Sequence, residues 1–215
     1  MKSICIYCGS APGNDPAFLQ EARRAGALIA EKGLTLIYGG GRVGLMGALA
    51  DAALAAGGKV VGVIPADLVS QEIAHRGLSE LRVVNSMHER KWAMAEIADG
   101  FLCLPGGAGT FEEIFEQWTW ALLGFHSKPC GFVNVDGYYE PLRAAITNMV
   151  TNGFLQPQYG DMLVYAADTR EALERFETYV PPARNGASRR SSSGTRAAER
   201  RCSLRGASIP APAPT

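Results

Sequence analysis

Short apolar runs alternate along the chain with longer stretches whose apolar residues recur at helical spacing, and the two patterns predict two kinds of element. The apolar runs predict strands at residues 3–8, 34–38, 59–64, 81–84, 100–104, 131–135 and 162–165. The stretches between them predict helices at about residues 15–32, 44–57, 86–98, 110–124, 139–152 and 168–179. No internal repeat is present.

The order of these elements predicts the fold class. Strands that alternate with helices form a parallel sheet with helices on both faces. The predicted strands are apolar throughout, as strands buried on both faces are. We therefore expect an α/β protein with a doubly wound, Rossmann-like parallel sheet, built as one domain over residues 1–182. In such a sheet, ligands bind beyond the carboxyl ends of the strands.

Residues 183–215 differ from the rest of the chain. They end in Pro-Ala-Pro-Ala-Pro-Thr and hold almost no aliphatic residue that could pack, which predicts a disordered tail. The tail contains seven arginines and one acidic residue, Glu199, so residues 1–182 keep 14 of the 21 basic and 20 of the 21 acidic side chains. Charge alone allows contact with nucleic acid or a membrane surface. Because no aromatic residues are interleaved, we expect a solvated tail with neither partner.

Composition narrows the class of protein. A chain of 215 residues with 47% hydrophobic and 20% charged residues can bury a core, which excludes a wholly disordered or collagen-like protein. No apolar run approaches the roughly 20 residues that span a bilayer, and the start of the chain lacks the pattern of a signal peptide. Five cysteines, an odd number, favour reduced thiols and a cytoplasmic protein.

The sequence predicts neither a metal site nor a bound cofactor. Cys5 and Cys8 match C-x-x-C, but they lie an odd number of positions apart on a predicted strand and are expected on opposite faces of the sheet. The three histidines show no metal-ligand spacing. No G-x-S-x-G motif of a serine hydrolase occurs.

A first glycine-rich turn, at residues 39–47, follows the second predicted strand. Gly39, Gly41 and Gly44 match G-x-G-x-x-G, a spacing that lets backbone approach a phosphate. A dinucleotide site also needs an acidic residue at the end of the next strand, and that strand instead runs into Pro65. NAD binding is therefore not expected. Two interpretations stay open: a phosphate cradle, or glycines that only allow a tight turn and close helix packing.

A second glycine-rich turn, at residues 105–113, follows the strand at 100–104 and opens a helix. Its glycines and Thr110 predict an anion-binding helix start, although no Walker A motif is present. Glu112 and Glu113 lie where an anion would bind. Thr110-x-x-Glu113 also fits a capping box, so Glu113 is either a helix cap or a catalytic group.

A third segment adds a cation on the predicted inner side of a helix. Ser86-x-x-Glu89 is a capping box that opens a helix, and Arg90 and Lys91 fall in its early turns, the unfavourable end of the helix dipole for cations. At helical spacing Arg90 projects with Met94 on the inner side. The alternative to a bound phosphate or carboxylate is an arginine whose charged tip reaches water.

Together these segments resemble the Lonely Guy family of cytokinin-activating phosphoribohydrolases. The resemblance rests on Gly39-Gly-Gly-x-x-Gly-Leu-Met-Gly47, Met87-x-x-Arg90-Lys91 and Pro105-Gly-Gly-x-Gly-Thr-x-x-Glu113, and it extends over about residues 1–180. It implies a modified Rossmann fold, a dimer or larger oligomer, no redox cofactor, and hydrolysis of the N-glycosidic bond in N6-modified adenosine 5′-monophosphates. Many relatives carry the label lysine decarboxylase, which this chemistry does not support.

The resemblance also implies roles for individual residues. Arg90 and Glu113 would be the catalytic pair. The residues that would line the nucleotide site are Ser10, Gly40, Gly41, Glu72, Lys91, Gly107, Ala108, Gly109, Thr110, Phe111, Glu112 and Thr119. Elementary chemistry agrees, because a carboxylate stabilises an oxocarbenium-like ribosyl centre and a helix start with a cation holds a phosphate.

Three rival functions remain open at this stage. A pyridoxal-phosphate decarboxylase would need a Schiff-base lysine, and Lys91 is the lysine in a candidate site. A non-catalytic protein could carry a nucleotide or a related cofactor. The same hydrolysis could act on plain AMP.

Aromatic residues supply candidates for a base slot and for an interface. Met87, Trp92, Trp118, Trp120 and Phe154 could contact the base, although each is more often a core residue. The helix at 110–124 is apolar on two sides, which suggests burial against both the sheet and a second subunit. We therefore expect a homodimer.

Overall fold

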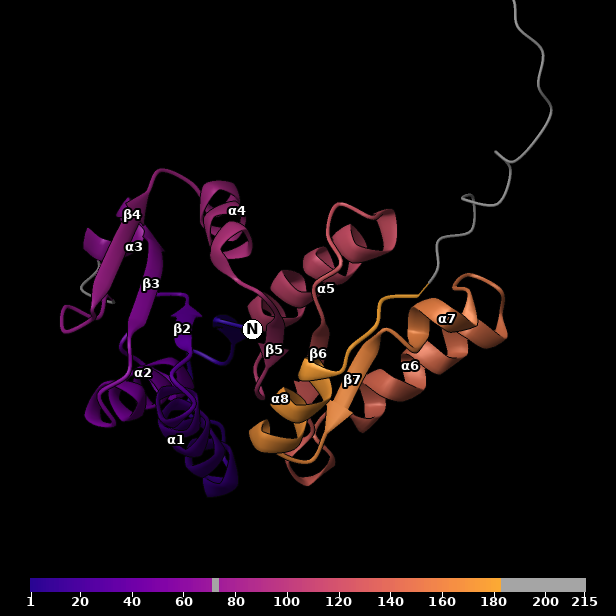
Figure 1. Cartoon of the computed structure of the whole chain (residues 1–215), viewed down its shortest axis with the longest axis horizontal. Helices are drawn as coiled ribbons and strands as arrows, with labels where there is room; N and C mark the ends of the chain where they lie inside the picture. The colour runs from indigo at the N-terminus through magenta and orange to yellow at the C-terminus, as the bar shows by residue number, and fades with distance from the viewer. Residues whose placement is uncertain (71–73, 183–215) are drawn as a thin grey trace, which may run out of the picture. The chain divides into compact units, whose positions relative to one another are not determined.

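The computed structural model describes residues 1–70 and 74–182, so predictions about Glu72 and the tail at 183–215 lie outside the described residues. The strands are β1 (Ser3–Tyr7), β2 (Thr35–Tyr38), β3 (Val60–Pro65), β4 (Glu80–Val84), β5 (Phe101–Cys103), β6 (Cys130–Val133) and β7 (Leu163–Ala166). The helices are α1 (Pro16–Glu31), α2 (Gly44–Ala55), α3 (Ala66–Ser70), α4 (Met87–Ile97), α5 (Ala108–Leu123), η1 (Val135–Gly137), α6 (Glu140–Thr151), α7 (Pro157–Gly160) and α8 (Thr169–Glu177) (Figure 1).

Every predicted strand and helix is present, with ends that differ from the expected ones by at most two residues. The pattern missed α3, α7 and the 3₁₀ turn η1. Each of these has five residues or fewer, which is too short for a 3.6-residue period to show in the sequence.

The seven strands form one parallel sheet in the order β4-β3-β2-β1-β5-β6-β7, which confirms the predicted α/β class. Strands β2, β3 and β4 follow one another on one side of β1, and β5, β6 and β7 follow one another on its other side. The register there pairs Cys5 with Phe101 and Tyr7 with Cys103. The strand order therefore reverses between β1 and β5, where ligands bind in sheets of this kind.

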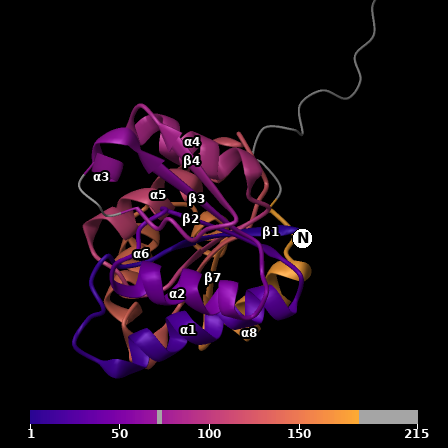
Figure 2. The ribbon, with the colours of Figure 1, turned by 90° about the vertical axis from the view of Figure 1, so that its left-hand side faces the viewer.

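Two layers of helices cover the sheet (Figure 2). Helices α1, α2 and α8 pack on one face, and α4, α5 and α6 pack on the other. Cys8 belongs to the first apolar core and Cys5 to the second, which confirms that the C-x-x-C pair points to opposite faces. Among the described residues, no helix is long and apolar enough to cross a membrane.

The loops that follow β1, β2 and β5 are joined at the carboxyl edge of the sheet. The Gly9 N–H donates to the Pro105 carbonyl at 3.0 Å, and the Leu45 N–H donates to the Gly9 carbonyl at 3.1 Å. The Tyr138 hydroxyl donates to the Gly106 carbonyl at 2.7 Å. Both glycine-rich turns are therefore bonded to Gly9, in the loop after β1.

Candidate functional site

The start of α4 places Arg90 on the inner side of that helix. The Ser86 hydroxyl accepts a hydrogen bond from the Glu89 N–H at 3.1 Å, as the capping box predicts. The Glu89 carboxylate reaches back to the Asn85 N–H at 2.8 Å, one residue earlier than the standard box. This cap fixes the first turn, and the Arg90 residue is only 8% exposed.

Three oxygen-bearing groups hold the Arg90 guanidinium, and Nη1 also lies 3.8 Å from the sulfur of Met87. Nε donates to the Val63 carbonyl at 3.0 Å, and Nη2 donates to the Gly39 carbonyl at 3.1 Å. Nη1 lies 3.3 Å from the Glu113 carboxylate. The buried cation therefore meets an anion, and the alternative of a charged tip in water is wrong.

The capping-box alternative for Thr110 and Glu113 is also wrong. Helix α5 begins at Ala108, two residues earlier than expected, with Gly107 as its N-cap and no side-chain cap. Thr110 is thus already inside the first turn, and Glu113 lies in the second. The Glu113 carboxylate faces Arg90 instead of the helix's own N–H groups, and it is 8% exposed.

The environment of Glu113 brings its titration close to neutral pH. Burial raises the pKa of the Glu113 carboxyl from 4.5 to about 7, and the Arg90 charge opposes part of that rise. Glu112 and Glu116 raise the pKa of Glu113 further, while Lys91 lowers it. A carboxyl that titrates near neutral pH can accept a proton during a reaction and give it back.

Lys91, in α4, binds two carboxylates of the neighbouring helix α5. Its ammonium pairs with Glu112, and it lies 3.1 Å from a carboxylate oxygen of Glu116. Burial lowers the pKa of Lys91, but the hydrogen bonds to Glu112 and Glu116 outweigh burial and leave that pKa above its ordinary value. A Schiff-base lysine needs a neutral amine, so this geometry argues against the decarboxylase alternative.

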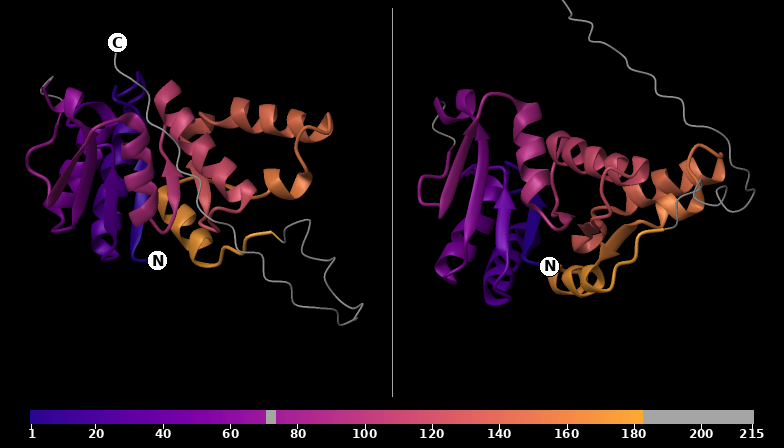
Figure 3. Two further views of the ribbon diagram at one scale, coloured as in Figure 1. Left: turned by 90° about the horizontal axis from the view of Figure 1, so that it is seen from above. Right: turned by 45° about the horizontal axis from the view of Figure 1, so that its top comes forward.

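Sequence reasoning did not single out Glu116 as a site residue. A signal was available, because residues four apart on a helix lie on one face, and Glu112 and Glu116 have that spacing. Figure 3 shows α4 and α5 side by side, and their pairing through Lys91 places Glu116 next to the site.

The open end of α5 exposes the second glycine turn. Gly107, Ala108 and Gly109 are exposed, and a β-carbon at Gly107 or Gly109 would meet no atom within 4 Å. Gly106 differs, because a β-carbon there would lie 2.1 Å from Oγ1 of the buried Thr110. Packing thus explains the glycine at 106 but not those at 107 and 109, which lie at the start of α5, where the first N–H groups have no acceptor within the helix.

The remaining predicted residues lie on α5 and in the loop after β1. Phe111 is half-buried and packs edge-on against Tyr139, with ring centroids 5.8 Å apart. Thr119 is exposed, two helical turns beyond Glu112 on the same side of α5. Ser10 is exposed. It follows Gly9, whose N–H donates to the Pro105 carbonyl of the second glycine turn.

Gly40 and Gly41 lie in the first glycine turn and are buried. The Gly40 carbonyl accepts a hydrogen bond from the His75 N–H at 2.8 Å, and Gly41 forms a β-bridge with Ala74. Both glycines are therefore covered by the chain itself, in contrast to Gly107 and Gly109.

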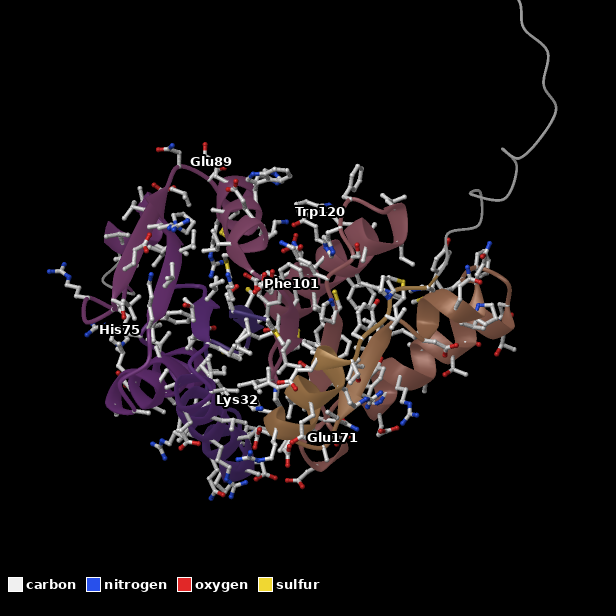
Figure 4. All side chains as sticks on the ribbon, in the orientation of Figure 1. Lys32, His75, Glu89, Phe101, Trp120 and Glu171 are labelled. Atoms are coloured by element: carbon white, nitrogen blue, oxygen red, sulfur yellow. The ribbon has the colours of Figure 1, made fainter. Side chains whose placement is uncertain are left out.

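The candidate base-slot residues fall into two groups. Trp118 is 4% exposed and its indole N–H donates to the Tyr159 carbonyl at 3.1 Å, so it is a core residue. Trp92 is 62% exposed and packs edge-on against Trp120, labelled in Figure 4, with ring centroids 5.7 Å apart. Met87 and Phe154 are exposed.

Within the described ranges, no group of three His, Cys, Asp or Glu side chains could hold a metal ion.

These observations define a class: a Rossmann-like α/β protein with a buried carboxylate–arginine pair at the carboxyl edge of its sheet. A family model described as "Possible lysine decarboxylase" matches residues 46–176. The cytokinin riboside 5'-monophosphate phosphoribohydrolase of Rhodococcoides fascians is 47% identical over 173 residues, which cover 80% of this chain and 87% of that protein. The enzyme of the same name from Arabidopsis thaliana, LOG1, is 41% identical over 190 residues, which cover 88% of this chain and 89% of that protein.

Among solved structures, the molybdenum cofactor binding protein from Rippkaea orientalis has the same fold. Its TM-score is 0.63 at 21% identity, and the match covers 83% of this chain and 97% of that chain. At 21% identity this structure shows the fold alone. The relatives at 41–47% identity show the family: the chain belongs to the Lonely Guy family of phosphoribohydrolases, as its three motifs predict.

Proposed function

We propose that the protein hydrolyses the N-glycosidic bond of cytokinin riboside 5′-monophosphates and releases the free cytokinin base and ribose 5-phosphate. The observation that carries this proposal is the buried Arg90–Glu113 pair beside the open start of α5. Family membership supports it, because the relatives compared above are named for this activity. The site offers one place for a phosphate and another for the reacting sugar.

The start of α5 suits the 5′-phosphate. The first-turn N–H groups of residues 108–110 have no acceptor within the helix, and the helix dipole adds positive potential there. Gly107 is the N-cap of α5, a position where glycine is common. Gly109 lies inside the helix, where a glycine costs about 0.5–1 kcal/mol relative to alanine, and no packing requires it. Close approach of a ligand to the backbone accounts for Gly109. Binding of this remote phosphate helps to orient the ribose.

Glu113 is proposed to act at the ribose. Departure of the base leaves positive charge on the anomeric carbon and ring oxygen, and a carboxylate nearby stabilises that charge. Glu113 in its ionised form also accepts a proton from the attacking water, whose oxygen bonds to the anomeric carbon as the bond to nitrogen breaks. The departing base takes up a proton, so the products are a neutral base and ribose 5-phosphate.

The other predicted residues are proposed to line the nucleotide around this pair. Lys91 and Glu112 are the next residues along α4 and α5 from this pair and are bonded to each other, which supports a role for them in the same site. The residues proposed as further contacts are Ser10, Ala108, Thr110, Phe111 and Thr119. Gly40 and Gly41, which the chain itself covers, are proposed to shape the site from the first glycine turn. Glu72, also implied by the resemblance, lies outside the described residues.

The assay uses purified protein with isopentenyladenosine 5′-monophosphate, with AMP and with the dephosphorylated riboside, and follows the free base by chromatography. We expect base from the monophosphates and at most a trace from the riboside, because the riboside lacks the phosphate that α5 would bind. The ratio of the two monophosphate rates separates a cytokinin enzyme from an AMP nucleosidase. Binding of every nucleotide without release of base would contradict hydrolysis and favour the carrier function.

We further propose that the protein acts as a homodimer that buries an apolar groove between α4 and α5. The groove is lined by Val84, His88, Glu89, Trp92, Ala93, Glu116 and Trp120. An exposed indole beside a second indole is unusual on the surface of a monomer and typical of interfaces. A second copy of this chain would cover both rings.

Charge placed in this groove should separate the subunits. We expect wild-type protein to have twice the 22.9 kDa mass of the chain and Trp92→Glu to have the mass of one chain, because a buried carboxylate would be unpaired. Size-exclusion chromatography with light scattering measures both masses. Val180→Glu, at an exposed apolar residue outside the groove, should leave the dimer intact. A Trp92→Glu protein that stays dimeric would place the interface elsewhere.

We also propose a cytoplasmic location. Cys5, Cys8, Cys103 and Cys130 are buried and unpaired in the described part of the chain. Free thiols are typical of reducing compartments.

A further inference from the structure

The first glycine turn contacts Arg90 in a way that its G-x-G-x-x-G spacing does not predict. A β-carbon built on Gly39 would lie 1.9 Å from Nη2 and 3.1 Å from Cζ of Arg90. The carbonyl of the same glycine accepts the hydrogen bond from Nη2 at 3.1 Å. The guanidinium therefore lies directly against the Gly39 backbone, in space that any other residue would fill.

Two neighbouring strands supply the carbonyls that hold this guanidinium. Gly39 follows β2, and Val63, which accepts from Nε at 3.0 Å, lies in β3 beside it. With Nε and Nη2 fixed in this way, Nη1 is directed at Glu113, 3.3 Å away. The planar guanidinium is rigid, so a displacement of one nitrogen moves the others.

Another glycine of the turn also has a packing role. A β-carbon at Gly44 would lie 2.4 Å from the carbonyl oxygen of Ser10, in the loop after β1. Close packing thus explains Gly39 and Gly44 within the chain itself, without a bound phosphate.

We propose that Gly39 is a positioning residue that seats Arg90 against Glu113. This inference rests on the proposed function, because it concerns the same pair of residues. The first glycine turn serves the catalytic pair by leaving room for a side chain, whereas the exposed second turn leaves room for a ligand. In this proposal Gly39 acts through Arg90 and not by contact with the substrate.

Gly39→Ala tests this seat. The φ of Gly39 lies outside the left-handed region, so alanine fits the backbone, and the clash falls on the end of a flexible side chain. We expect the melting temperature to stay close to that of wild type while kcat/KM falls by about 10-fold to 10²-fold, because Arg90 is displaced. Gly160→Ala is the matched control: its β-carbon would make ordinary contacts at 3.4 Å or more, and activity should be unchanged.

A double-mutant cycle shows whether Gly39 acts through Arg90. In an Arg90→Ala background the guanidinium is gone, so the alanine at 39 has no clash and should lower kcat/KM no more than about twofold further. Multiplying effects of the two substitutions would mean that Gly39 acts by another route, and the proposal would be overturned.

A second readout does not depend on turnover. In ¹³C NMR of glutamate-labelled protein, with Glu113 assigned by Glu113→Gln, we expect Gly39→Ala to raise the pKa of Glu113. Among the described residues, the charged groups that influence that carboxyl are Arg90, Lys91, Glu112 and Glu116. Of these four, Arg90 is the one that lies against Gly39. An unchanged pKa would overturn the inference. If wild-type protein released no base from any monophosphate, the proposed function would fail, but this titration would still decide the role of Gly39.

Discussion

Replacement of Glu113 by Gln should lower kcat/KM for isopentenyladenosine 5′-monophosphate by about 10³-fold or more, while the fold is retained. The amide keeps the shape of the side chain but neither accepts a proton nor carries negative charge toward the ribosyl centre. The substitution removes both proposed contributions at once. Release of free base, followed by chromatography, measures the loss.

The stability of this variant should change with pH in a defined direction. Burial raises the pKa of Glu113 from 4.5 to about 7, so its contribution to stability is fully present below about pH 4.5 and is lost as pH rises through about 7. Gln does not titrate, so the melting temperature of Glu113→Gln should rise relative to wild type between about pH 5 and pH 8. Glu174→Gln, at an exposed residue of α8, is the control for both measurements. A Glu113→Gln protein that keeps a tenth of wild-type kcat/KM would exclude the proposed role.

Arg90→Ala is expected to produce the second largest effect, a fall in kcat/KM of about 10²-fold at pH 7. In wild type, ionisation of Glu113 should give kcat/KM a rise with pH centred near the pKa of about 7. Arg90 lowers that pKa, so its removal should shift the rise to higher pH. A pH series of kcat/KM values for both proteins measures the shift.

Two comparisons make the Arg90 result specific. Arg90→Lys keeps the charge but loses the planar fork that spans Val63, Gly39 and Glu113, so part of the activity and part of the pH shift should remain. Arg23→Ala, at an exposed residue of α1, should leave the pH profile unchanged. If Arg90→Ala lost activity without any shift in the pH profile, Arg90 would act on the substrate and not on the ionisation of Glu113.

The family model and the site point to different chemistry. The model's description names a possible lysine decarboxylase, whereas Lys91, the lysine at the site, is paired with Glu112 and Glu116 and has a raised pKa. An amine held in its charged form is a poor nucleophile for a carbonyl. The buried carboxylate Glu113 instead suits hydrolysis.

The sequence alone determined the order and type of the long elements and the side of α4 that carries Arg90. Both follow from local periodicity, because an apolar strand and a 3.6-residue repeat are patterns of residues that are close together in the sequence. The three motifs also located the helix start at the second glycine turn and the acidic residues beside it.

Only the tertiary structure decided what Arg90 meets. Its partners Gly39, Val63 and Glu113 come from the turn after β2, from β3 and from α5, and they converge because the strand order reverses beside β1. Local pattern gave Glu113 two possible roles, a cap or a catalyst, and the early start of α5 removed the first. The raised pKa of Glu113 and the seat at Gly39 depend on burial between distant segments, which no local spacing encodes.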